Sequence, residues 1–500
     1  MATGETNNPK RTLRWWHGLE IALGVPVFIL PSISTFSGMI GAFAIIIWMF
    51  SVFQGFMQTV AYGELASRYP NCNGLPGFTQ AVFSQGSKRE YGFGKFIGGL
   101  CAWSYLFTWS AVLSVFSVLI GHYLIGLIPA LGDYAALYPW FSKVFSLCVG
   151  AVVFSTLILI NHRGIGGGAI AGWILAVVSL IPLFIISIAG IFSGHFEITN
   201  ITHHWFPSEW SWDFNGIILF VGILALAQWS ACGFEAAALY APHYKKPRKD
   251  IPKALFGCGI VCIFSYFLVQ FSATGALGVD GIAANVNDPM LALAKLSMGN
   301  VGAIISIVML LAAMVMIIQT AMYSGSMAMA SMADEGNLQK VFGKRNRHGA
   351  PWVAMITVSL FNLVLIALGD SAASLLAAAA IGYVVANGLG LFAFVKARID
   401  LKKEKWEETK ARENVVADED IFHAPKAWFV VALVFGILQL PLYIVGTTYL
   451  NMQDYGLIAA SMAFVILLIF VPLWFLARAT NMKKSKKAKE KSMADEGKPA

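Results

Sequence analysis

The sequence predicts an all-α polytopic membrane protein with 12 transmembrane helices, on the evidence of its composition, its apolar runs and its distribution of positive charge. Of the 500 residues, 57% are hydrophobic and only 12% are charged, and the mean hydropathy is +0.68. A soluble domain needs a more polar surface, and repeated apolar runs of about 20 residues have the length of bilayer-spanning helices. The strands of a membrane barrel would instead alternate over segments of about ten residues, which the sequence does not show.

The apolar runs divide the chain into two groups of five helices and a final pair. We expect helices 1–5 in residues 17–193, helices 6–10 in residues 214–396, and helices 11 and 12 in residues 427–478. The remaining parts are a cytoplasmic tail (1–16), an extracytoplasmic loop (194–213), a cytoplasmic linker (397–426) and a basic cytoplasmic tail (479–500). The second, seventh and eighth helices are expected at about 40–62, 254–276 and 303–332.

The distribution of positive charge predicts the orientation in the membrane. When the loops are assigned alternately to the two sides, all but Lys143 and Lys295 of the 35 Lys and Arg residues fall on the inner side. This bias predicts cytoplasmic N and C termini and a place in the cytoplasmic (inner) membrane, with the lipid bilayer as a partner. Because the basic residues are spread over many inner loops, the net charge of +8 does not indicate nucleic acid. The Lys-rich stretch 483–491 is expected to be disordered, with contact to anionic lipid as the alternative.

The stretch from Leu226 to Lys253 is the most informative part of the chain. It places a carboxylate, Glu235, inside an apolar segment directly after the small residues Ala231, Cys232 and Gly233. An ionisable group at a helix centre costs roughly 2.5 kcal/mol or more on insertion, so it indicates a function by default. Three roles stay open for Glu235: a proton carrier, a partner for an ammonium group, or a hydrogen-bonding strut between helices.

A second interruption lies in the first apolar run, at Gly24-Val25-Pro26. Glycine and proline together free backbone groups from the helical ladder, and in a bilayer this is tolerated only where the backbone is buried or lines a cavity. The alternative is a simple proline kink. The two interruptions each open a group of five helices, so we expect two repeats of opposite orientation, with a binding site where the interruptions meet.

At these residues the chain resembles the amino acid-polyamine-organocation superfamily of permeases, of the amino acid permease type. The resemblance covers nearly the whole chain. It rests on Gly24 to Pro31, on Gly63-Glu64-Leu65, on Gly233-Phe234-Glu235 followed by Lys246 to Ala254, and on Met332 to Leu338. The resemblance implies the 5+5 inverted-repeat fold of the bacterial leucine transporter, with broken first and sixth helices. It also implies secondary active transport of amino acids by alternating access.

The resemblance further implies which residues form the site. Expected substrate-binding residues are Ala22, Leu23, Gly24, Val25, Pro26, Trp103, Trp229, Ala231, Cys232, Gly233 and Glu235. Trp229 takes the place of the family's occluding aromatic residue, with packing or lipid contact as the alternative. Candidates for ion coupling are Glu235, Ser179, Thr320 and Ser324, where Ser179 replaces a lysine of proton-coupled relatives. Glu20 is expected to extend to the inner interface or to pair with inner-side charges.

Substrate and coupling are left open by the sequence. A small amino acid is the first expectation, but Val25 and Pro26 weaken recognition of a carboxylate. A polyamine or organic-amine permease, or an amino acid/amine antiporter, is the alternative, and a channel or a non-transporting sensor is a weaker one. Neither a cofactor nor a bound metal is expected, and the coupling ion is H⁺ or Na⁺, or transport is exchange. An enzyme is not expected, because His203 and His204 lack metal-ligand spacing and the chain has no glycine-rich phosphate loop.

Overall fold

The structure, a computed structural model, describes residues 11–24, 26–85, 91–163, 165–203, 205–285, 288–368, 372–401 and 422–496. These ranges contain helices and no named strand, apart from an isolated bridge between Leu13 and Tyr244. Residues 402–421 of the predicted linker, and Val25 of the first interruption, lie outside the described residues.

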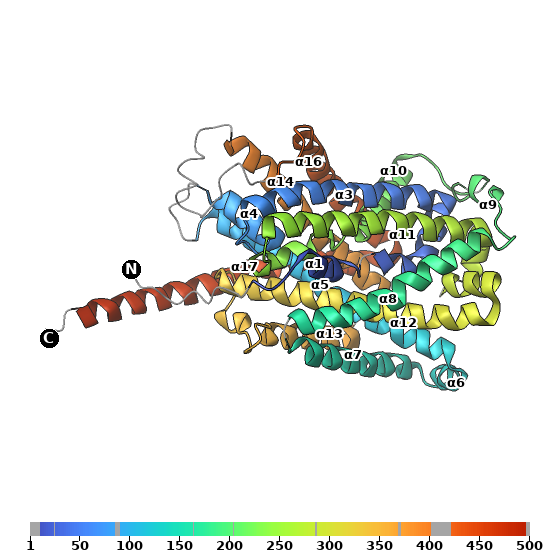
Figure 1. Ribbon diagram of the computed structural model, residues 1–500, viewed down its shortest axis with the longest axis horizontal. Coiled ribbons are helices and arrows are strands. Elements are labelled where there is room, and N and C mark those ends of the chain that lie inside the picture. Colours follow the sequence, from blue (N-terminus) through green and yellow to red (C-terminus); the bar gives the residue numbers. More distant parts are fainter. Residues whose placement is uncertain are drawn as a thin grey trace.

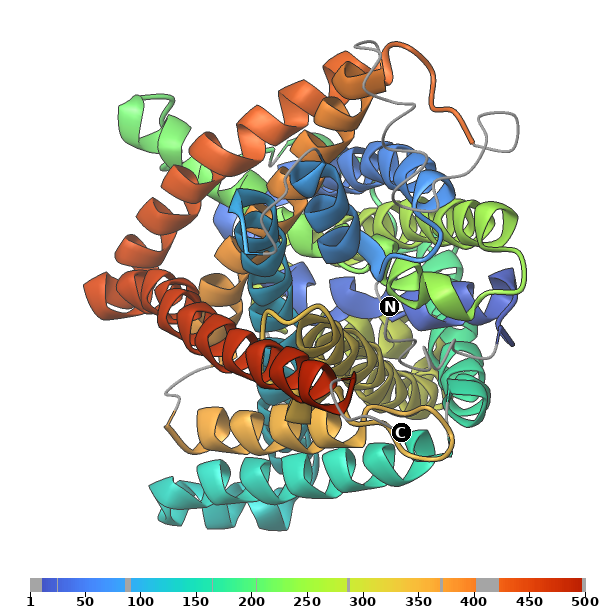
Figure 2. The same ribbon diagram turned by 90° about the vertical axis from the view of Figure 1, so that its left-hand side faces the viewer.

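The helices run side by side along the long axis of the molecule (Figure 1), and Figure 2 shows the bundle from one end. In chain order the main elements are α1 (Trp15–Ala22), η1 (Pro26–Ser32), α2 (Ile33–Ile40), α3 (Ala44–Arg68), α4 (Gly74–Ser84), α5 (Phe93–Leu127), α6 (Pro129–Leu137), α7 (Pro139–Asn161), α8 (Ile165–Ile191), α9 (Thr199–Thr202), α10 (Phe214–Ala227), η3 (Gln228–Ser230), η4 (Phe234–His243), α11 (Pro247–Ala284), α12 (Pro289–Asp334), η5 (Lys340–Gly343), α13 (Trp352–Leu368), α14 (Ala372–Leu401), α16 (Trp428–Ile437), η7 (Leu438–Tyr443) and α17 (Ile444–Glu496).

Within the described residues, nine helices are long and apolar enough to cross a membrane, and a tenth span is formed by the bent pair of α10–η3 and η4. Two shorter apolar helices, Trp15–Leu30 and Trp352–Ala367, accompany them. The chain is therefore a multi-pass, all-helical membrane protein. The sequence expected the seventh and eighth helices at about 254–276 and 303–332. The backbone of α11 and α12 is interrupted near these limits, at Gly278 and Gly299, where φ is +69° and +64°.

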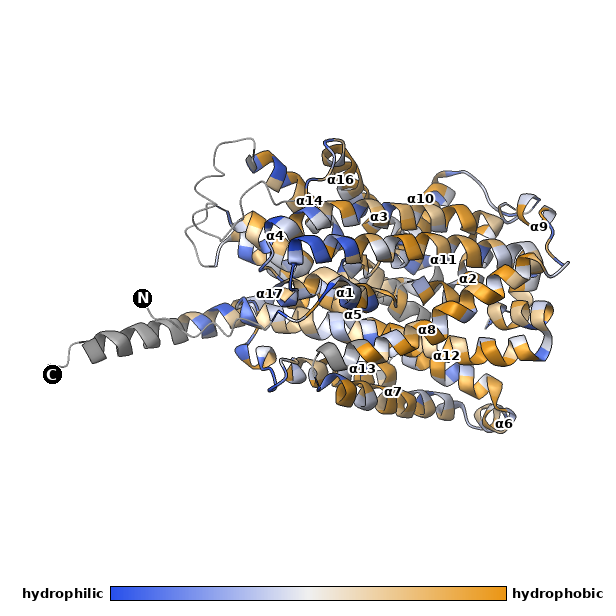
Figure 3. Ribbon diagram, viewed as in Figure 1, coloured by the Kyte–Doolittle hydropathy of each residue, from blue (hydrophilic) through white to orange (hydrophobic). Residues whose placement is uncertain are grey.

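The outer surface of the bundle is apolar, as Figure 3 shows. On α8 the exposed side chains recur at helical spacing and form one stripe: Ile170, Ile174, Val177, Ile181, Ile185 and Ile188. The opposite face of the same helix buries Ser179, Leu183 and Ile186. A helix with its aliphatic face outward and its polar residue inward is suited to lipid outside and to packing inside.

A buried ion cluster joins three segments at one end of the bundle. Glu64, 1% exposed at the end of α3, accepts hydrogen bonds from Arg68 at 2.8 Å, from Arg398 of α14 at 2.5 Å and from the backbone N–H of Ala424 at 2.8 Å. The side chain of Phe422 packs against Gly63. A carboxylate with several charged donors can stay ionised when buried, so the Gly63-Glu64-Leu65 motif fixes both ends of the linker, at Arg398 and Ala424, onto α3.

The Met332–Leu338 motif ends α12 and anchors it. Gly336 has a left-handed φ of +79°, and the N–H groups of Asn337 and Leu338 turn back to the carbonyl of Met332. These hydrogen bonds give a carbonyl group at the end of the helix the donors that it would otherwise lack. The side chain of Asn337 then accepts a hydrogen bond from Trp474 of α17 at 3.1 Å and donates one to Gln80 of α4 at 2.8 Å.

The prediction of a disordered basic tail was wrong for most of its length. Helix α17 continues to Glu496, through the whole of residues 483–491, and projects from the bundle in Figure 1. Lysine and alanine are good helix formers, and nothing between 482 and 496 breaks a helix that has already begun in the apolar part.

Opposite ends of the bundle carry the loop with α9 and the loop with η5 (Figure 1). We predict that a cysteine at exposed Ser208 reacts with an impermeant maleimide added outside cells, whereas a cysteine at exposed Lys344 reacts only after permeabilisation. The parent chain, with its six free cysteines, gives the background. Labelling of Lys344Cys from outside, with Ser208Cys protected, would contradict the orientation.

Candidate functional site

The first break separates α1 from η1. Helix α1 stops at Ala22, and a 3₁₀ segment begins at Pro26, whose ring cannot donate to the ladder. Gly24 lies in the break, and helix α12 passes directly against it. A Cβ at this position would lie 2.4 Å from the hydroxyl of Thr320 and 3.4 Å from the carbonyl of Met316. The predicted interruption is therefore present, and glycine allows the close approach of α12.

The second break lies between η3 and η4, where the chain bends by 42°. Gly233 holds the turn with a left-handed φ of +105°, which favours glycine. The carbonyls that the break frees receive side-chain donors: Tyr383 of α14 donates to Ala231 O at 2.8 Å, and Ser51 of α3 donates to Ala227 O at 2.7 Å. Both neighbouring helices thus supply hydrogen bonds that the broken helix lacks.

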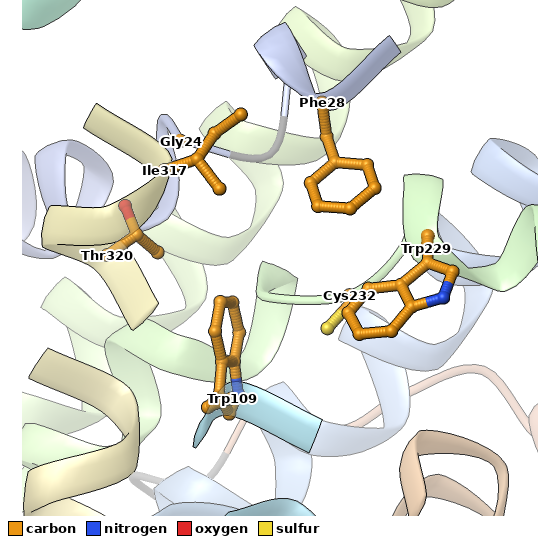
Figure 4. Close-up of a pocket in the computed structure, with 7 residues that line it drawn as sticks. All are labelled: Gly24, Phe28, Trp109, Trp229, Cys232, Ile317 and Thr320. Atoms are coloured by element: carbon orange, nitrogen blue, oxygen red, sulfur yellow. The ribbon is translucent and has the colours of Figure 1, made fainter. Parts of the chain in front are cut away.

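A small closed cavity lies between the two breaks (Figure 4). Its wall is formed by Gly24, Phe28, Trp109, Trp229, Cys232, Ile317 and Thr320. The volume of the cavity is about 10 Å³, which is enough for about one water molecule. A substrate of amino-acid size therefore needs the wall to move.

Aromatic side chains close this cavity. The rings of Phe28 and Trp229 stack at 5.3 Å with an interplanar angle of 7°, and Phe28 also meets Phe116 edge-on at 5.1 Å. Trp229 is 3% exposed and its indole N–H has no acceptor within the described residues. The sequence expected Trp229 to close over the site, and the structure places it in the wall, in contact with the 3₁₀ segment of the first break.

Four expected residues lie in the cavity wall: Gly24, Trp229, Cys232 and Thr320. Ala22, Leu23, Ala231 and Gly233 are buried in or beside the breaks, and Pro26 starts η1. Trp103 lies elsewhere, where it donates to Ile466 O at 2.8 Å and borders a separate apolar cavity with Leu106 and Leu473. Phe28, Trp109 and Ile317 line the site without having been expected. Phe28 comes four residues after Gly24, and Ile317 comes three residues before Thr320. This spacing in the sequence could have identified both residues as neighbours of the expected site.

Glu235 stands behind the second break and not in the cavity wall. Its Oε2 atom accepts from the N–H of Gly233 at 3.3 Å and lies 3.4 Å from the hydroxyl of Tyr383, whose proton makes the shorter bond to Ala231 O. The hydroxyl of Tyr105 faces the same carboxylate from α5, and Oε1 has no hydrogen-bond partner within the described residues. This geometry is that of a strut between helices, while the roles as proton carrier and as ammonium partner stay predictions.

A buried polar network supports the segment that carries Trp229. Gln228 donates to Ser51 at 3.2 Å and to Gln54 at 3.0 Å, and it accepts from Gln439 of η7 at 3.1 Å. Tyr443 donates to Gln54 at 3.0 Å. Hydrogen bonds between glutamine side chains are strengthened by the low-dielectric interior. They fix the position of the segment where the break begins.

The coupling candidates are dispersed along α8 and α12. Ser179 donates to Leu175 O at 2.7 Å and contacts the sulfur of Met316 at 3.5 Å, so its hydroxyl is engaged within α8 and against α12. The hydroxyl of Ser324 is buried without a partner in the described part of the chain. Glu20 differs from its expectation. It is 2% exposed, so it neither extends to the interface nor pairs with inner-side charge.

The comparisons with known proteins agree with this architecture. The family model described as "Amino acid permease" matches residues 15–478. The chain belongs to the amino acid permease family. All the elements of the site lie inside the matched range.

Individual relatives of the family are distant. The chain is similar to an arginine/ornithine antiporter of Latilactobacillus sakei, with 25% identity over 65% of this chain and 65% of the relative. It is similar to a probable polyamine transporter of Arabidopsis thaliana, with 24% identity over 60% and 56% of the two chains. It is also similar to a lysine-specific permease of Lactococcus lactis, with 26% identity over 45% and 46%. The chain thus spans between about half and two thirds of these relatives.

We predict that Gly24→Ala overpacks the first break. The added Cβ would meet the Thr320 side chain at 2.4 and 3.0 Å, and overpacking of this kind costs roughly 1–3 kcal/mol of stability. The melting temperature in detergent should fall by several degrees, and Thr320→Ala in the same chain should restore part of the loss. Gly38→Ala is the matched control, because no atom lies within 4 Å of its Cβ position. Equal melting temperatures for Gly24→Ala and Gly38→Ala would show that the close approach is absent.

Proposed function

We propose that this protein is a secondary transporter that moves an amino acid across the cytoplasmic membrane by alternating access, with both termini cytoplasmic. One observation carries the proposal: two helix breaks meet around a cavity that is closed by stacked aromatic rings. A buried break is tolerated where it lines a site, and half-helix ends together with freed carbonyls suit the two charges of a zwitterion. Membership of the amino acid permease family supports the same function.

The proposed architecture is the 12-span, 5+5 inverted repeat. The candidate spans and shorter apolar helices supply the number of segments required. Helices in corresponding positions of the two proposed repeats also pack against each other: α3 against α11, α5 against α12, and α7 against α13. Packing between corresponding helices is what two inverted repeats around a shared axis would produce.

The wall of the cavity constrains the substrate. Apart from the hydroxyl of Thr320 and the backbone at Gly24, the wall is formed by aromatic, aliphatic and thiol side chains. Such a wall suits the aliphatic part of a small amino acid, while the backbone of the two breaks supplies polar contacts. Recognition would then depend on backbone geometry more than on a charged side chain.

A second candidate is transport or exchange of an amine, including a dibasic amino acid or a polyamine. Glu235 favours it, because this carboxylate lies two residues beyond Gly233 and has one oxygen without a partner within the described residues. Rearrangement of the break would bring that oxygen toward an ammonium group. Relatives named for arginine/ornithine exchange and for polyamines agree with this candidate.

Uptake into proteoliposomes tests both candidates. Radiolabelled L-alanine, L-leucine, L-arginine, L-lysine and putrescine would be supplied separately, and saturable uptake with counterflow is expected for at least one amino acid. Saturable putrescine uptake without amino acid uptake would select the amine candidate. Non-saturable flux of all five, or no flux, would contradict a transporter.

We predict that Trp229→Ala weakens apparent affinity by about tenfold or more, because the stacked pair no longer closes the cavity. The matched control is Trp352→Ala, whose indole is 41% exposed on the surface of the bundle and should leave uptake close to that of the parent. Equal affinity in the two variants would remove the closing role of Trp229.

We predict that Glu235→Gln lowers uptake by roughly tenfold or more across acidic to mildly alkaline pH. The amide oxygen can still accept from the N–H of Gly233, but the amide carries no negative charge and exchanges no proton, so it can serve neither as a proton carrier nor as a partner for an ammonium group. Tyr383→Phe removes one donor only and should give a smaller loss. Normal uptake by Glu235→Gln would show that Glu235 has at most a structural role.

A further inference from the structure

Glu20 is a buried carboxylate with one oxygen that no described residue of the fold satisfies. It lies in α1, one helical turn before the first break, and is 2% exposed. Its Oε2 atom has no hydrogen-bond partner among the described residues. The carboxylate fits against α8 at Gly172, where a Cβ would lie only 1.4 Å from Oε1. A side chain at position 172 would therefore expel Glu20 from the α1–α8 interface.

The titratable groups that face Glu20 are phenols, and no ion pair to Glu20 occurs among the described residues. The titratable side chains that interact with it are Tyr240 and Tyr244, on the far side of the second break, and Tyr323 of α12. On α8 the facing positions are Gly172 and, one turn earlier, Gly168, against which the Tyr323 hydroxyl packs. Within α1, His17 is one turn away, and its ring is used to accept from the N–H of Arg14.

Two other buried carboxylates of the bundle, Glu64 and Glu235, have hydrogen-bond donors. Glu64 has two arginines and a backbone N–H, and Glu235 has a backbone N–H and a phenol. An ionised carboxylate without such donors is costly in a low-dielectric interior, and the group takes up a proton instead.

We propose that Glu20 is the proton-coupling site of this transporter, protonated while α1 packs on α8 and deprotonated when the two helices separate toward the cytoplasm. The proposal rests on the transport function proposed above. It also accounts for Ser179. The resemblance aligns this residue with a lysine of proton-coupled relatives, whereas this chain has a hydroxyl there that is engaged with Leu175 O and cannot take up a proton.

The opposite side of α1 carries a natural reporter of this separation. The thiol of Cys258, on α11, donates to the carbonyl of Ala22 at 3.4 Å and is fully buried. Movement of α1 away from the bundle breaks this contact and exposes the thiol. Alkylation of Cys258 therefore measures the position of α1 without any substrate.

The first experiment compares alkylation of Cys258 by N-ethylmaleimide at about pH 6 and about pH 8 in the full-length protein in lipid nanodiscs, read by mass spectrometry at the modified residue. Every thiol reacts faster at higher pH, so Glu20→Gln supplies the baseline for the same thiol in the same place. We expect the two rates to agree at pH 6 and the parent rate to exceed the Glu20→Gln rate severalfold at pH 8. Glu235→Gln, the matched loss of a different buried carboxylate, should keep the difference.

Equal rates in the parent and Glu20→Gln at both pH values would overturn the proposal. So would a pH response that Glu235→Gln abolishes and Glu20→Gln retains. Neither outcome depends on uptake, so failure of the proton site is distinguishable from failure of the transport function.

The second experiment uses proteoliposomes with L-arginine and L-alanine as probes. An inwardly directed proton gradient should drive accumulation by the parent, and Glu20→Gln should lose that gradient dependence while it retains counterflow. Gradient-driven accumulation by Glu20→Gln would overturn the proposal. Absence of counterflow in both proteins would instead contradict the transport of these probes, and the alkylation result would still decide the role of Glu20.

Discussion

The structure depends on one constraint: backbone groups that leave the helical ladder inside a membrane need partners from the protein itself. Each unsatisfied group costs several kcal/mol where water is excluded. The second break meets this requirement with Tyr383 on Ala231 O and Ser51 on Ala227 O. The positions of α3 and α14 beside the break follow from it, and so does the presence of the two hydroxyl side chains where these helices face the break.

The same constraint explains why the cavity is small and closed. Breaks that face each other must be covered from water on both sides, and Phe28, Trp109 and Trp229 provide the cover with rigid rings. The glutamine network behind Trp229 holds the cover in place. A site that is closed by packing and supported by exchangeable hydrogen bonds has two ways to open, one toward each side, as alternating access requires.

The sequence predicted the breaks better than the residues between them. Gly24 and Gly233 could be located because glycine and proline interrupt helices by known mechanisms, and Glu235 because carboxylates are rare in apolar runs. Glu64 was identified by its resemblance to a family motif. The choice of Trp103 over Trp109 could not be made well. Helix α5 is apolar around most of its circumference, so its periodicity does not tell which face meets the cavity and which meets α17.

Burial of Glu20 could not be read from the sequence for a related reason. Its position near basic residues suggested an interface, but the recess that accepts the carboxylate is created by Gly172 on a helix far along the chain. Glycines of this kind are visible in a sequence, whereas the residue that fills the space above them is set by packing. The extension of α17 beyond its apolar part was missed because hydropathy locates the membrane and not the end of the helix.

The most direct measurement of alternating access is the distance between spin labels on α1, at Trp15, and on the loop after η5, at Lys344, determined by pulsed electron paramagnetic resonance in nanodiscs. Both side chains are exposed. The account predicts at least two distance populations, one matching the closed structure and one longer, with proportions that shift when a transported amino acid is added. A single distance that no amino acid or amine alters would contradict movement of α1 and, with it, the proposed mechanism.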